Sequence, residues 1–118
     1  MFIEDEVNPL AIKFVEGDWG IILPINLKTE DGETITNSDN FVIKIFEKIN
    51  EEPLIEKTFS NIQNNTIEFQ LTEIDTEKLP VGNYFYDLDW YQDNNFLCNL
   101  IAKEKLVVIE KAGNVDEG

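Results

Sequence analysis

The chain has 118 residues with 9 basic and 24 acidic side chains, so its formal net charge at pH 7 is −15. It has no histidine and every basic residue is a lysine, which excludes Ser–His and Cys–His catalysis, imidazole metal ligation and an arginine fork for phosphate. The negative charge also disfavours nucleic acid and anionic membranes as partners. We expect one domain over 1–118, with an N-terminal arm at 1–11 and a flexible acidic tail at 112–118.

Cys98 is the only cysteine, so an intrachain disulfide and a thiolate zinc cluster are both excluded. It shares the parity of Leu100 and Ala102 along a predicted strand, which predicts an inward-facing, unreactive thiol opposite Trp90. The first residues do not have the basic and apolar regions of a signal peptide, and no apolar run has the length of a membrane-spanning helix. We therefore expect synthesis in a cytoplasm, and no cofactor.

Alternating apolar residues dominate the first two thirds of the chain. From Trp19 to Leu27 they predict a strand with one buried face, and Pro24 on the opposite parity favours an edge strand or a bulge. Asp31-Gly32 then predicts a tight turn. Further strands are expected at 41–48, 55–59 and 66–71, with turns at 50–52 and 64–65.

The last third of the chain contains one expected helix and a hairpin. Thr72 is a predicted N-cap for a helix over 71–79, which is too short to form a layer and should cap the sheets. A strand at 83–92 places Tyr84, Tyr86, Leu88 and Trp90 on one parity. A three-residue turn at Asp93–Asn95 leads to a strand at 96–103, and the run at 105–110 continues that strand or bends after Lys103.

About seven or eight short strands, with one short helical turn before the penultimate hairpin strand, predict an all-β antiparallel sandwich, and a small closed barrel is the alternative. Gly82 followed by Tyr84 at a strand start resembles the tyrosine corner of immunoglobulin-like sandwiches, in which the hydroxyl bonds back to nearby backbone. An ordinary helix-to-strand loop with a buried tyrosine is the other interpretation. Tyr86 occupies the position of the second sandwich cysteine.

A wider pattern supports the same family. The motifs are Gly17-Asp18-Trp19 before a strand, the Asp31-Gly32 turn, Ile67, Phe69 and Leu71-Thr72, and the run LPVGNYFYDLDW from Leu79 to Trp90. This succession, over roughly residues 12–110, resembles the immunoglobulin-like domains of tailed-phage and prophage structural proteins, especially that of baseplate upper proteins.

The resemblance implies a non-enzymatic structural component of a phage or prophage virion, made in the cytoplasm of the bacterial host. It would act through protein–protein contacts with other virion proteins, as a baseplate, fibre-associated or capsid-surface module, and association between copies of the chain stays open. The rival interpretation is a carbohydrate-binding module that stacks Tyr91 and Trp19 on sugar rings.

Asp87 and Asp89 are the one pair of carboxylates whose spacing could serve a metal site or catalysis. Two residues apart on a strand, they project from the same face about 7 Å apart, and with Asp93 they offer oxygen ligands for calcium. A flat strand face offers too few oxygens to wrap an ion, and no cleft with sugar-stacking aromatics is evident for glycosidase chemistry. We therefore interpret these residues as a solvated acidic face and expect neither a metal site nor a catalytic site.

The expected register of the final hairpin predicts a partner-binding surface. If Trp90, Leu88 and Tyr86 pair inward with Cys98, Leu100 and Ala102, the opposite parity faces outward. The outward apolar residues are then Phe85, Tyr91, Leu97 and Ile101. An apolar face of this size is typical of a protein interface. The alternative is that the segment Phe2 to Val15 folds back and covers it.

Overall fold

Eight strands and one short helix account for most of the part of the chain that the structure describes. The computed structural model describes residues 1–3, 11–18, 20, 22–29, 34–48 and 50–111. The elements are β1 (Phe2–Ile3), β2 (Ile12–Val15), β3 (Ile22–Lys28), β4 (Asp39–Phe46), β5 (Ile55–Ser60), β6 (Thr66–Gln70), α1 (Glu73–Glu77), β7 (Gly82–Gln92) and β8 (Asn95–Ile109). The all-β fold class is confirmed.

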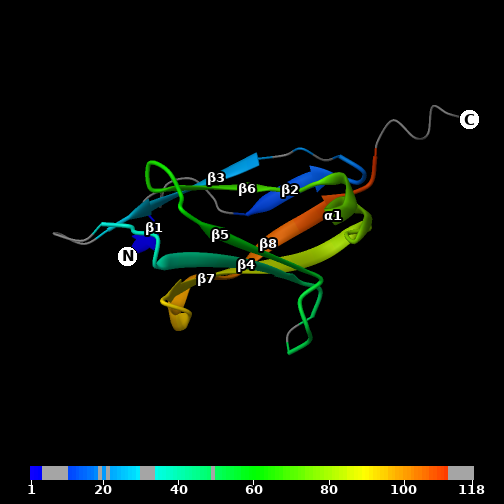
Figure 1. Cartoon of the computed structure of the whole chain (residues 1–118). Coiled ribbons are helices and arrows are strands. Elements are labelled where there is room, and N and C mark those ends of the chain that lie inside the picture. Colours follow the sequence, from blue (N-terminus) through cyan, green and yellow to red (C-terminus); the bar gives the residue numbers. More distant parts are fainter. Residues whose placement is uncertain (4–10, 19, 21, 30–33, 49, 112–118) are drawn as a thin grey trace, which may run out of the picture.

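The strands form two sheets, which Figure 1 shows as two layers with α1 at one end. The smaller sheet has the order β1-β3-β6 and the larger has the order β2-β8-β7-β4-β5. Every pairing between these strands is antiparallel except that of β2 with β8, which is parallel. The larger sheet is therefore mixed, whereas the sequence pattern predicted only antiparallel pairs.

The core lies between the two sheets. Side chains of β3 and β6 meet side chains of β4, β7 and β8, and the rings of Phe69 and Tyr86 approach to 6.1 Å between centroids across the layers. The most buried members that lie in strands are Ile25, Leu27, Phe41, Ile43, Ile45, Ile67, Tyr86, Leu88, Leu106 and Val108. These residues occupy alternate positions of their strands, so the period-2 pattern correctly predicted which faces are buried.

Pro24 lies in a strand that has neighbours on both sides. β3 is the central strand of its sheet, so the prediction of an edge strand is wrong for the strand as a whole, but at Pro24 the described strand is not fully paired, as the pattern predicted. At Pro24 itself the described pairing is with Glu68 of β6, because β1 pairs only with Leu27 and Lys28. The missing N–H of proline is tolerated where one side of the strand has no described partner. Trp19 and the Asp31-Gly32 turn are outside the described residues.

The final hairpin has a tighter turn than predicted. Gln92 pairs with Asn95, so the turn contains two residues, Asp93 and Asn94, with φ of 50° and 66°. Both positive values are those of a type I′ turn, whose twist matches that of the flanking strands. β8 runs on to Ile109 as one strand, with an irregularity at Lys103, where φ is 53°.

The described strands of the amino-terminal segment, β1 and β2, extend the two sheets. β1 pairs with β3 in the smaller sheet, and β2 pairs with β8 at the edge of the larger one. Ile12 and Phe14 of β2 are buried in the core. For the described residues of this segment, the predicted alternative of a covering arm is therefore wrong, and the strand at β2 was not predicted.

Candidate protein-binding surface

The pairing of β7 with β8 decides which side chains of the final hairpin face outward. The predicted pair Trp90–Cys98 is confirmed, as is the pair Asp89–Asn99 that the same register implies, but the register shifts at three places along the ladder. Such shifts arise where a strand carries an unpaired extra residue. The pairs toward the start of β7 therefore differ from the prediction. They are Leu88–Ile101, Tyr86–Glu104 and Phe85–Lys105, in place of Leu88–Leu100, Tyr86–Ala102 and Phe85–Lys103.

Ile101 is the predicted partner-binding residue that these shifts move inward. It lies opposite Leu88, belongs to the core and is only 5% exposed. The prediction that Ile101 faces outward is therefore wrong. An extra residue reverses the parity of everything that follows it, as a one-residue slip of register does. The residue types of β8 gave no signal for these irregularities.

The other three predicted residues, Phe85, Tyr91 and Leu97, do not enter the core. Phe85 stacks on Phe46 of β4 with ring centroids 5.6 Å apart, and Tyr91 meets the ring of Phe96 edge-on, also at 5.6 Å. Phe46 and Phe85 alternate with core residues, so this pair lies on the outer side of the larger sheet.

Near the hairpin turn, Phe96 is 52% exposed and Leu97 is 43% exposed. We call Phe46, Phe85, Tyr91, Phe96 and Leu97 the outer aromatic surface.

A polar cluster separates the two aromatic pairs. Asp89 is buried, accepts a hydrogen bond from the Asn99 amide and lies 3.7 Å from the Lys44 ammonium. Burial raises the pKa of Asp89 and the nearby Asp87 carboxylate adds to the rise, while Lys44 and Asn99 only partly oppose it. The prediction of a solvated acidic face is therefore wrong at Asp89.

The carboxylates of Asp87 and Asp89 both accept hydrogen bonds from β8. Asp87 accepts a hydrogen bond of 2.7 Å from the backbone N–H of Lys103, at the irregularity in β8. Asp93 lies in the exposed turn. Within the described ranges, no group of three or more acidic or cysteine side chains has the arrangement of a metal site.

Tyr84 forms the predicted corner. Its hydroxyl donates a hydrogen bond of 2.6 Å to the carbonyl oxygen of Pro80, four residues upstream, and its ring is buried. Gly82 lies beneath this ring, 3.7 Å from the hydroxyl measured at the position that a Cβ would take. The bond fixes the connection between α1 and β7, as in a tyrosine corner.

A buried carboxylate that the sequence pattern did not reveal fixes Trp90. Asp39 is 2% exposed, and its Oδ1 accepts hydrogen bonds from the Trp90 indole at 2.9 Å and from the Gln92 amide at 3.3 Å. Its Oδ2 accepts the backbone N–H of Thr36. The sequence analysis placed Trp90 and Cys98 on the inward face. In the structure Trp90 is only half-buried against the core, and Cys98 opposite it is likewise half-buried.

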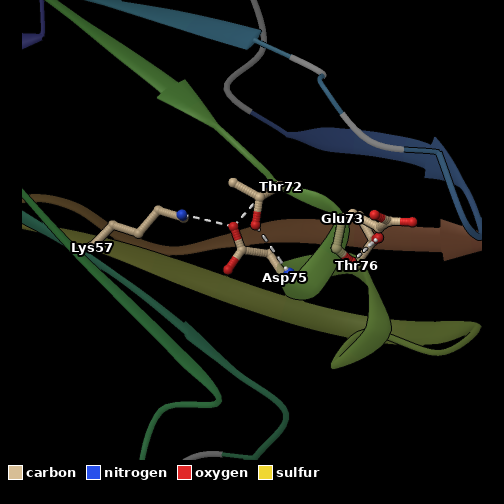
Figure 2. Close-up of polar contacts among 5 residues, drawn as sticks. All are labelled: Lys57, Thr72, Glu73, Asp75 and Thr76. Carbon is tan, nitrogen blue, oxygen red and sulfur yellow. Dashed lines mark hydrogen bonds and ion pairs between the residues drawn. The ribbon is translucent and has the colours of Figure 1, made fainter.

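A second cluster links the edge strand β5 to α1, as Figure 2 shows. Thr72 and Asp75 form a reciprocal capping box at the start of the helix, which confirms Thr72 as the N-cap. Lys57 reaches across from β5, and its ammonium lies 2.7 Å from Asp75. Burial alone would raise the pKa of Asp75, but the bonds from Lys57 and Thr72 outweigh it and lower the pKa. A charged side chain that points inward also blunts an exposed sheet edge.

A shallow depression of about 420 Å³ lies beside Tyr91 on the outer side of the larger sheet. Val42 points to the outer side of the sheet, because its neighbours Phe41 and Ile43 face the core. It is nevertheless buried, and it contributes apolar surface to this depression. The lining residues are Asn40, Val42, Thr58, Tyr91 and Asn94. Of the two aromatic residues predicted to stack on sugars, Tyr91 lies here and Trp19 is outside the described residues.

Comparison with known proteins identifies no relative. No protein-family model matches the chain, and no curated protein and no solved structure matches it. Among the described residues, no helix is long and apolar enough to cross a membrane.

Proposed function

We propose that the chain is an immunoglobulin-like sandwich domain. The order β8-β7-β4-β5 corresponds to strands G, F, C and C′ of variable-type immunoglobulin domains, and β3 and β6 take the places of strands B and E. In this correspondence β7 is strand F, and the Tyr84 hydroxyl bond lies at its start, where those domains carry their tyrosine corner.

The domain acts by binding other proteins and not by catalysis. The observation that carries this proposal is the outer aromatic surface, whose apolar side chains are half-buried or exposed. Aromatic residues are enriched at protein interfaces, where they combine a large contact area with few rotatable bonds. Phe96 and Leu97, each more than two fifths exposed, are the first anchors that a partner meets.

The partners are other structural proteins of a phage or prophage virion, in which the domain is a baseplate, fibre-associated or capsid-surface module. The resemblance of the motifs from Gly17 to Trp90 supports this role, and the tyrosine corner is a structural element of the same family. A virion location also agrees with a single unpaired thiol, because the protein folds in a bacterial cytoplasm before assembly.

Light scattering coupled to size-exclusion chromatography tests the proposal. The purified chain is measured alone and mixed with tail and capsid proteins of the same phage or prophage, and we expect a stable complex with at least one of them. The double variant Phe96→Ala and Leu97→Ala should weaken that complex by about 2 kcal/mol or more, because exposed anchors carry much of the binding energy.

Ile74→Ala is the matched control. Ile74 is 65% exposed on α1, near the start of β7 and so at the opposite end of that strand from Phe96 and Leu97, and its loss should leave the complex unchanged. If the double variant and the control bind equally well, the outer aromatic surface is not the interface.

A further inference from the structure

The depression beside Tyr91 has a lining without charged side chains. All five of its lining side chains are uncharged, in a chain whose net charge is −15. It therefore lacks a counter-charge for a phosphate or carboxylate ligand, and the acidic chain repels both. It also has no carboxylate that could hold a cation. The charge pattern selects a neutral ligand.

The polar groups around the depression have no partners within the described part of the chain. Neither the amides of Asn40 and Asn94 nor the hydroxyl of Thr58 makes a hydrogen bond to another described residue. Each amide offers donors and an acceptor, and the hydroxyl offers both functions. Asn94 is fixed in the two-residue turn at φ 66°, so its position relative to Tyr91 is set by the hairpin. The ligand consequently has several hydroxyl or amide groups.

The apolar side of the depression is formed by Tyr91 and Val42. The Tyr91 ring is half-buried and meets Phe96 edge-on, which fixes its orientation. A volume of about 420 Å³ falls within the range of ligand sites, which combine apolar walls with a few convergent polar groups. The ligand therefore has an apolar face as well as hydroxyl groups at its edge.

We propose that this depression binds a neutral sugar, a hexose or N-acetylhexosamine unit of a glycan. The C–H face of the sugar ring lies against Tyr91 and Val42, and its hydroxyl groups bond to Asn40, Thr58 and Asn94. This goes beyond the proposed protein contacts, because it assigns a second ligand to one end of the outer aromatic surface.

NMR titration of the ¹⁵N-labelled chain with glucose, galactose and N-acetylglucosamine tests the proposal. At least one of the three should shift the backbone signals of Asn40, Thr58 and Asn94, with a dissociation constant on the order of 1 mM for so small a ligand. Tyr91→Ala should weaken binding by at least about tenfold, while Tyr91→Phe, which keeps the ring, should retain it. Thermal unfolding of each variant shows whether it is folded.

A pair of isosteric variants gives the matched control. Asn40→Asp and Asn83→Asp make the same chemical change, but Asn83 lies exposed at the start of β7, at the other end of that strand from Tyr91. Only Asn40→Asp should weaken sugar binding, and Thr58→Val should weaken it as well.

Absence of localised shifts with all three sugars overturns the inference. So does loss of a virion-protein complex on Tyr91→Ala in a chain that binds no sugar, which means that a protein side chain fills the depression. The second result leaves the proposed protein-binding function standing. If the chain binds a sugar but forms no complex with a virion protein, the sugar site stands and the proposed protein-binding function is overturned.

Discussion

Tyr84 shows how one hydroxyl group can secure a loop. Its bond to the Pro80 carbonyl is nearly buried, so Tyr84→Phe removes the bond without leaving a cavity. We expect a loss of about 1 kcal/mol in the free energy of unfolding, measured by urea denaturation. Tyr91→Phe is the control, because no hydrogen bond of its hydroxyl is present in the described structure. Equal midpoints for the two variants would contradict a stabilising role for the corner.

Asp75 makes stability depend on pH. Its pKa is lowered from 3.8, so its charged form stabilises the fold above that value, and this contribution is lost as pH falls through the lower folded-state pKa. Asp75→Asn should therefore cost about 2 kcal/mol at pH 7, the scale of a hydrogen bond to a charged group.

In denaturation curves, the difference between the wild type and Asp75→Asn should begin to shrink as the pH falls below 3.8, and it should be smallest below the lowered folded-state pKa, where Asp75 is neutral. A gap that stays constant across the titration would show that the charge of Asp75 contributes nothing. Glu73→Gln, at an exposed position of the same helix, controls for the loss of a negative charge.

At the scale of the strands, alternation predicted the core and failed at bulges. Every strand from β4 to β7 has its buried face on the predicted parity, because a strand with one buried face must alternate. The bulges of β8 arise from pairing with β7, which is not a property of β8 alone. For that reason Ile101 was assigned to the wrong face, whereas Phe85, Tyr91 and Leu97 were correctly kept out of the core.

Charged groups inside the fold were the other gap in the sequence analysis. Asp39 and Asp75 are buried because donors from distant segments meet them, namely Trp90 from β7 and Lys57 from β5. A single sequence does not reveal such long-range pairs. Asp75 had one local signal, its position three residues after Thr72, which is the spacing of a capping box.

Neighbouring aromatic residues on β7 should respond differently to truncation. Trp90→Ala removes a side chain packed on the core and deprives the buried Asp39 of a donor, so we expect a loss of about 3 kcal/mol or more. Tyr91→Ala, one residue on and facing outward, should cost only about 1 kcal/mol. Thermal or urea unfolding of the two variants measures both. Equal losses would mean that another part of the chain covers Tyr91.

The hairpin turn offers a stabilising substitution. Asn94 has a positive φ in the second central position of its turn, which glycine adopts without steric cost. Asn94→Gly should raise the free energy of unfolding by about 0.5 kcal/mol. Asn94→Val should lower it, since a β-branched residue resists that conformation. A melting temperature that does not differ between the two variants would contradict the assignment of the turn.

For the molecule as a whole, charge opposes compactness. With a net charge of −15, the carboxylates repel one another, and salt shortens the reach of this repulsion from about 30 Å at 0.01 M to about 8 Å at 0.15 M. We expect the melting temperature to rise over this range of sodium chloride concentration. Exchanging the exposed Glu51 and Glu52 for lysine should raise the melting temperature at low salt and reduce its salt dependence. A flat response in the wild type would argue against self-repulsion.

The parallel pairing of β2 with β8 has a consequence for how the chain reaches its native state. Ile12 pairs with Leu106, so the larger sheet joins segments from near the two ends of the sequence. During synthesis, Ile12 leaves the ribosome 94 residues before Leu106, so β2 has no partner until β8 has been made. Closing so long a loop is slow, because its entropy is lost before the new contacts form. In the interval, the apolar side of β2, with Ile12 and Phe14, has no completed sheet to join, and that is the stage at which the newborn chain is most open to aggregation.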